Sequence, residues 1–159
     1  MPVALKRSRG RRGLTLVELI VAFTIMLMLS AMAVPLARYK VRRDKERDLR
    51  VALREIRIAI DKYKDLADAG QLGPTKIGTD NYPETMETLV EGVKIAGPVD
   101  KKIRFLRRIP KDPFTNSREW GVRSTQDDPD SKSWGGQNVF DVYTKSMEKA
   151  ADGTPYAEW

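Results

Sequence analysis

A single carboxylate stands inside an apolar segment near the N-terminus. Glu18 is the only charged residue within positions 14–37. An ionised side chain in such a segment is costly unless a partner pairs with it, and within a membrane it normally marks a functional site. We therefore expect Glu18 to act through pairing with a cation.

The composition excludes most other chemistry. The 159-residue chain contains no cysteine and no histidine, so disulfides, histidine-ligated metals, and catalytic groups of the Ser-His-Asp or Cys-His type are ruled out. Carboxylate chemistry remains formally open, but no catalytic constellation and no Gly-rich phosphate loop is present. The sequence thus predicts a protein that is not an enzyme.

The segment around Glu18 has the composition of a membrane helix with a basic leader. The leader contains five basic residues and no acid, namely Lys6, Arg7, Arg9, Arg11 and Arg12. Removing it would reduce the net charge from +7 to +2, because 7 − 5 = 2. About 20 apolar residues span a bilayer, and positive flanks stay on the cytoplasmic side. This predicts one membrane span with the remaining chain across the membrane.

The N-terminal segment has three alternative interpretations in which Glu18 has no special function. Ala31-Met32-Ala33 fits a secretory cleavage site, which would release a soluble chain beginning at Val34. The arginines at 11 and 12 fit a twin-arginine signal. A plain membrane anchor is the third alternative. Glu18 interrupts the core of either signal, and an anchor explains neither Glu18 nor Gly13 before the apolar run.

The N-terminal segment resembles the type III signal of type IV pilins and type II secretion pseudopilins. The resemblance rests on a basic leader ending in Gly13, on Glu18 at a fixed offset and on the apolar helix that follows. It implies that a prepilin peptidase cleaves after Gly13 and methylates the new amine of Leu14, a position where the family usually has Phe. Glu18 would then face the amine of a neighbouring subunit.

A long helix is predicted over residues 16–69, bent near Pro35 and ended by Gly70. After the membrane segment, apolar residues recur at spacings of four, three, four and three, which forms one stripe on an amphipathic helix. The stripe comprises Leu49, Leu53, Ile56, Ile60 and Tyr63. We expect it to pack against a C-terminal domain.

The sequence of the C-terminal half predicts an α+β domain. A short second helix begins within 82–91, with Thr85 as its cap and Val93 on its apolar face. Strands over 120–123 and 139–144 form a small antiparallel sheet on which the long helix lies. The expected organisation is a cleaved leader (1–13), a transmembrane and assembly helix (14–37), the amphipathic half of the helix (38–69) and a globular domain (70–159).

Three segments after the long helix narrow the resemblance to one family of pseudopilins. The segment Ile109-Pro110-Lys111-Asp112-Pro113, followed by Phe114, resembles the "lPkDPwg" sequence of the major pseudopilin of type II secretion, the general secretion pathway protein G-like subunit. Residues 82–90 and the tail ending in a tryptophan are also similar to that family. Two prolines stiffen the segment, and Asp112 is expected to accept backbone hydrogen bonds in a turn.

The resemblance implies a structural subunit that polymerises into a periplasmic pseudopilus driving protein export. Its implied partners are other copies of itself, minor pseudopilins, the prepilin peptidase, an inner-membrane assembly platform with its ATPase, and membrane lipid before assembly. The implied location is the inner membrane, with a single span and the C-terminal domain in the periplasm.

Two other functions remain open from the sequence. One is a subunit of a true type IV pilus for adhesion, motility or DNA uptake, although such pilins often carry a C-terminal disulfide and this chain has no cysteine. The other is a secreted globular domain. We expect no nucleic-acid partner, because the only basic cluster on the C-terminal domain is interpreted as a solvated loop. Its members are Lys101, Lys102, Arg104, Arg107, Arg108 and Lys111.

Calcium is a further expectation that comes from the resemblance, since the major pseudopilin family binds calcium in its C-terminal loops. Calcium requires 6–8 oxygen ligands. The candidates here are Asp141, Asp152 and Glu158, with further acids at 127–130. Lys145 and Lys149 lie in the same region and weaken such a site.

Overall fold

A computed structural model describes residues 15–97 and 101–159. The chain divides into two compact units, the first ending at Arg42 and the second comprising Arg43–Trp159. Helix α1, Leu16–Asp68, contributes residues to both units.

The limits of α1 agree with the sequence prediction to within one residue. Backbone positions stay helical on both sides of Pro35, and whether the proline kinks the helix stays a prediction. After the helix, Gly70 has φ +65° and its amide donates to the Ala67 carbonyl, while the amide of Gln71 donates to Leu66. A left-handed glycine with such bonds satisfies the last helical carbonyls and ends the helix.

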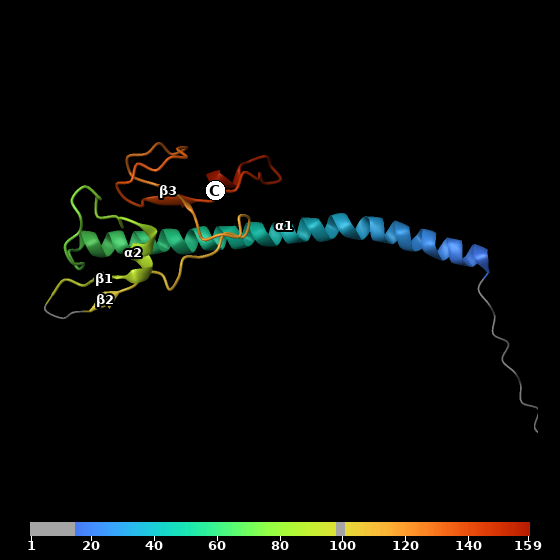
Figure 1. Ribbon diagram of the computed structural model, residues 1–159, viewed down its shortest axis with the longest axis horizontal. Helices are drawn as coiled ribbons and strands as arrows, with labels where there is room; N and C mark the ends of the chain where they lie inside the picture. Colours follow the sequence, from blue (N-terminus) through green and yellow to red (C-terminus); the bar gives the residue numbers. More distant parts are fainter. Residues whose placement is uncertain (1–14, 98–100) are drawn as a thin grey trace, which may run out of the picture. The chain divides into compact units, whose positions relative to one another are not determined.

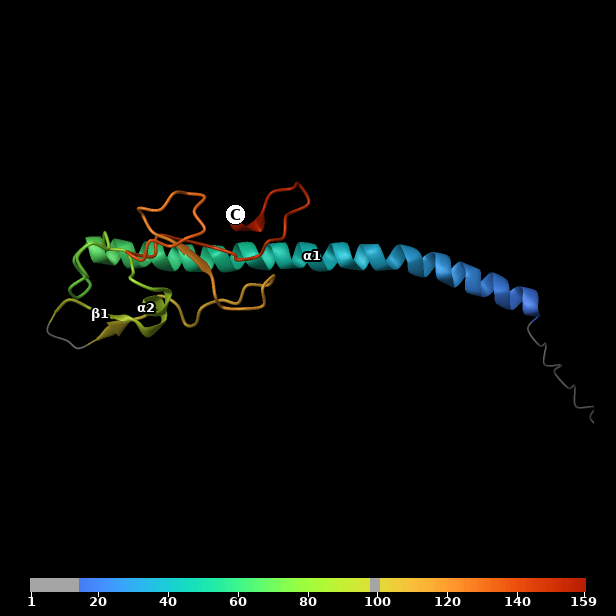
Figure 2. The same ribbon diagram turned by 45° about the horizontal axis from the view of Figure 1, so that its top comes forward.

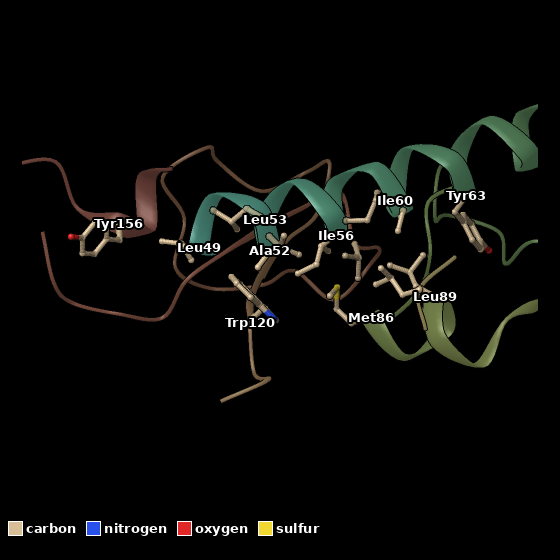
Figure 3. Packing of buried hydrophobic residues seen from close by; sticks show 14 of the residues in the cluster. Leu49, Ala52, Leu53, Ile56, Ile60, Tyr63, Met86, Leu89, Trp120 and Tyr156 are labelled. Carbon is tan, nitrogen blue, oxygen red and sulfur yellow. The ribbon is translucent and has the colours of Figure 1, made fainter. Parts of the chain in front are cut away.

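The predicted apolar stripe of α1 forms the core of the second unit. Figure 3 shows this stripe together with Met86 and Leu89 of the second helix and with Trp120, which belong to the same hydrophobic cluster. The five predicted residues are all buried: Leu49, Leu53, Ile56, Ile60 and Tyr63. Complete burial of an aliphatic side chain contributes about 1.5–3 kcal/mol, so this stripe is the main apolar contribution of α1 to the core.

The second helix, α2, is shorter than its predicted segment and spans Met86–Glu91. Thr85 occupies the N-cap position, but its side chain makes no capping hydrogen bond; its hydroxyl lies 3.2 Å from that of Thr88. The predicted position of the cap is confirmed, but the predicted capping hydrogen bond is wrong, because the Thr85 hydroxyl lies beside the Thr88 hydroxyl and does not bond a helical amide. Gly92, with φ +82°, follows the helix where a Cβ would lie 2.5 Å from the Ile103 carbonyl.

The strands form two small antiparallel sheets instead of one. Strand β3, Gly121–Arg123, pairs with β4, Asp141–Tyr143, at the predicted positions, with Val122 opposite Val142. Strand β1, Val93–Lys94, pairs with β2, Lys102–Ile103. The second pair corrects two predictions, since Val93 lies in a strand rather than on the helix and Lys102 in a strand rather than a loop. A 3₁₀ helix, η1, spans Tyr156–Glu158.

Within the second unit, the elements lie on different sides of α1. Helix α2 and strands β1 and β2 lie on one side, and the C-terminal segment lies on the opposite side (Figure 1, Figure 2). Their buried residues nevertheless belong to one hydrophobic cluster around the α1 stripe. The observed class is α+β, with a long helix packed against small antiparallel sheets and a short second helix, as predicted.

The Asp112 segment is a structural turn built around one buried side chain, that of Asp112. The Asp112 carboxylate is 0% exposed and accepts hydrogen bonds from the Phe114 amide (2.8 Å) and from the hydroxyl of Thr144 beside β4. Trp120 donates from its indole nitrogen to the Pro110 carbonyl at 3.0 Å. These bonds confirm the predicted turn and connect it to the end of β4.

Replacing Asp112 by Ala is expected to destabilise the second unit by about 3 kcal/mol, because buried donors lose a charged acceptor. Asp112→Asn retains the volume and an acceptor oxygen, so its effect is expected to be smaller. Urea unfolding of the full chain in detergent measures both. Asp128→Ala, at an exposed loop position, serves as the control, and an Asp112→Ala protein as stable as that control would contradict this role.

Candidate functional site

Glu18 lies in the first turn of α1, where Thr15 precedes the helix. The Glu18 amide donates to the Thr15 hydroxyl at 3.3 Å, and the Leu19 amide donates to the Thr15 carbonyl at 3.1 Å. Thr15 is thus the N-cap, and Glu18 is the third helical residue, where a negative charge interacts favourably with the helix dipole. The Glu18 side chain is exposed.

This cap was not predicted, although the sequence carries a signal for it. Thr15 followed three residues later by Glu18 has the spacing of a capping box, in which a Ser or Thr and a Glu satisfy the first helical amides. The structure contains the Thr15 half of this box, in which the hydroxyl accepts from the Glu18 amide, and among the described residues the Glu18 carboxylate forms no hydrogen bond. The spacing nevertheless makes capping an alternative to the predicted pairing role of Glu18. The two roles make different demands, because capping requires a side-chain acceptor and pairing requires a charge.

The surface of α1 in the first unit is apolar and exposed. Its 18-residue window has a mean hydropathy of 2.4 and none of it is buried within the protein. By length and composition the helix is able to cross a membrane. The large apolar side chains of this part of α1 are exposed, among them Leu16, Val17, Ile20, Val21, Ile25 and Leu29. The hydroxyl of Thr24 in this segment donates to the Ile20 carbonyl at 2.8 Å, so it needs no outside partner.

The predicted cleavage and methylation positions, Gly13 and Leu14, lie outside the described residues. Thr15 is the first described residue, and Glu18 is three positions further along the chain. The pairing of Glu18 with an amine on Leu14 of another copy therefore stays a prediction.

The calcium candidate Asp141 belongs to a structural ion pair. Its carboxylate accepts from Arg57 Nε at 2.7 Å, and Arg123 Nη1 lies 3.7 Å away. The same Arg57 donates through Nη2 to the main-chain oxygen of Trp159 at 2.8 Å. This arginine joins α1, β4 and the C-terminal segment. Its guanidinium already bonds the carboxylate oxygens of Asp141 that a metal cation would need as ligands.

The other two calcium candidates do not join Asp141 in a common site. Asp152 accepts a hydrogen bond from the Thr154 amide at 2.9 Å, and this bond lowers the pKa of the carboxyl. Glu158 lies in η1. Across residues 15–97 and 101–159, no group of three or more acidic side chains is placed to hold a metal ion. The three predicted ligands, Asp141, Asp152 and Glu158, therefore do not lie around one common site in the described residues. The effect of calcium on the full chain is a matter for measurement.

The N-terminal segment matches a known family signature. Residues 8–34 match the prokaryotic N-terminal methylation motif. The motif indicates a type IV pilin-like protein. No curated protein and no solved structure matches the chain.

The motif match indicates a role for the exposed apolar part of α1. The motif is a structural, pilin-type signature rather than an enzyme signature, and it suggests assembly into filaments with other pilin-like subunits. Together with the exposed apolar helix, it suggests that the pilin-like protein is anchored in a membrane. The exposed surface of the first unit is then the candidate site of both lipid contact and subunit contact.

Calcium is expected to leave the melting temperature of the pilin-like protein unchanged, because Arg57 already neutralises Asp141. Thermal unfolding of the full chain in detergent, first with a chelator and then with excess Ca²⁺, measures this. A ligand that binds only the native state must raise stability. A clear calcium-dependent rise would therefore contradict the expectation and would require ligands other than this set.

Proposed function

We propose that this pilin-like protein is the major subunit of a type II secretion pseudopilus. The single observation that carries the proposal is the methylation motif joined to an exposed apolar segment, residues 16–37, whose one charge is Glu18. Such a helix can be held in lipid before assembly and packed against other helices afterwards. Its role is mechanical: the filament grows by adding subunits and thereby drives export.

Glu18 supplies register in this proposal. Prepilin peptidase cleaves after Gly13 and methylates the amine of Leu14, and this cation pairs with Glu18 of a neighbouring subunit. A subunit out of register leaves a charge buried without a partner, which is strongly destabilising. The growing filament therefore accepts subunits at one axial position.

The choice of a secretion pseudopilus over a surface pilus rests on the turn at 109–114. Its sequence resembles that of major pseudopilins, and the buried Asp112 gives the resemblance a structural reason. The lack of cysteine also favours this choice. Minor pseudopilins, an inner-membrane platform and its ATPase are the partners proposed with it, and the second unit is placed in the periplasm.

The first expected result is a processed N-terminus. Intact mass and N-terminal peptide mapping of the membrane-associated protein should give a chain that begins at methylated Leu14. A soluble chain beginning at Val34 would overturn the proposal and indicate a secreted domain.

Glu18 variants separate its two roles. If the charge sets register, both Glu18→Gln and Glu18→Ala should be processed and membrane-bound yet assemble poorly, because neither pairs with the amine. If capping is the role, Glu18→Gln should assemble normally, since Gln can serve in a capping box. Sedimentation of sheared filaments gives the assembled fraction, and Thr15→Ala, which removes only the cap, is the matched control.

A further inference from the structure

The exposed face of α1 in the second unit carries two parallel stripes of side chains with different chemistry. The basic stripe consists of Arg43, Arg47, Arg50 and Arg54. The acidic stripe consists of Asp44, Asp48, Val51, Glu55 and Ile58. Every one of these side chains is exposed, so neither stripe contributes to the core of the unit.

The spacing fixes the relation between the two stripes. Each stripe repeats every three or four residues, which keeps its members on one face of a helix. The acidic stripe follows the basic stripe by one residue, and one residue corresponds to about 100° around a helix of 3.6 residues per turn. The stripes therefore lie side by side and face in different directions.

Contacts within the chain leave most of these charges available. Arg47 and Asp48 approach to 3.7 Å, but their side chains are 75% and 60% exposed, and a pair of this kind contributes little. Arg50 lies over the Trp159 ring, 4.2 Å from its centroid. In the parts of the chain that the structure describes, Arg43, Arg54 and Glu55 form no ion pair. Arg57 continues the basic row by one turn but is bound to Asp141.

The acidic stripe also has an apolar centre. Val51 and Ile58 are 58% and 46% exposed, one helical repeat apart, with Glu55 between them. They line a groove together with Phe105 and Leu106, and the charged residues of the lining are Glu55, Arg54, Lys62 and Arg107. A partner side chain inserted here would gain apolar burial, and a basic one would pair with Glu55 as the one carboxylate of the lining.

The charge balance of the second unit indicates what that partner is. Residues 43–159 carry 21 basic and 21 acidic side chains, because eight of the 29 basic and one of the 22 acidic residues precede position 43. A net charge of zero gives little general attraction to a polyanion. The charges are nevertheless separated into stripes of opposite sign, and each stripe complements the other.

We propose that the basic stripe of one copy docks on the acidic stripe of a second copy. This inference rests on the proposed filament function and names the surface of the second unit that serves it. Because the two surfaces differ, the contact is heterologous, and a heterologous contact that does not close into a ring continues as an open helical filament. The exposed charge pairs set register and choice of neighbour more than affinity.

Site-specific cross-linking tests the geometry, and the chain has no cysteine to interfere. Copies with Arg54→Cys and copies with Glu55→Cys are produced together with different tags and treated with a short thiol cross-linker. Cross-links between the two kinds of copy are expected, and each variant alone should give few. Arg118→Cys with Glu119→Cys is the matched control, because the same exposed Arg-Glu pair occurs there outside the stripes.

Charge reversal tests the energetics. Arg54→Glu or Glu55→Arg alone is expected to lower the assembled fraction about twofold to fivefold, the size expected for one exposed pair, because like charges would meet across the contact. The double variant Arg54→Glu with Glu55→Arg restores opposite charges and should restore assembly. The corresponding changes at Arg118 and Glu119 should leave assembly unchanged, and melting temperatures of all variants identify any loss of folding.

The outcomes separate this inference from the proposed function. A wild-type protein that is not processed at Gly13 and forms no filament overturns both. If the wild type assembles, three results overturn only the docking of the stripes: cross-links within the basic stripe alone, no cross-links between stripes, or unchanged assembly after charge reversal. Loss of binding to anionic lipid vesicles with unchanged assembly also overturns it and assigns the basic stripe to the membrane surface.

Discussion

The packing of the α1 stripe against the rest of the second unit is the interaction on which the fold depends. The strands are two or three residues long and form two separate two-stranded sheets. Sheets of that size are not stable alone in water. They persist because Leu49, Ile56 and Ile60 present a continuous apolar surface, and residues of α2 and of both sheets pack against it in one hydrophobic cluster. The helix is thus the framework, and the strands are its covering.

Buried polar groups then fix the loops that a disulfide-free chain has to order by other means. Asp112 connects its turn to the end of β4, and Arg57 joins β4 to the C-terminal segment. Asn138, which is fully buried, donates to the Thr79 carbonyl and to the hydroxyl of Thr125. Each group draws together segments that are far apart in sequence. The hydrogen bonds of these groups are needed for stability, because a buried polar group without a partner lowers the free energy of unfolding.

The sequence allowed the helix, its stripe and the β3–β4 pair to be predicted because each has a strong local pattern. A repeat of three and four residues and a terminal glycine define α1, and an apolar run defines β4. Strands β1 and β2 were missed because two residues, half of them lysine, carry no alternation. The Arg57–Asp141 pair joins residues 84 positions apart, a contact for which a single sequence has no signal. The cap at Thr15 does have a sequence signal, which is the three-residue spacing between Thr15 and Glu18. This signal coincides with the lone charge in the apolar segment, which was assigned to pairing between subunits.

The position of the first buried residue has a practical consequence. Leu49 is the earliest described residue in the core, and the compact unit begins at Arg43. Everything that precedes Arg43 is exposed as far as it is described. A recombinant fragment starting at that arginine would retain the whole hydrophobic cluster and discard the apolar segment. Crystallisation and solution spectroscopy could then be carried out on a fragment that lacks the exposed apolar helix.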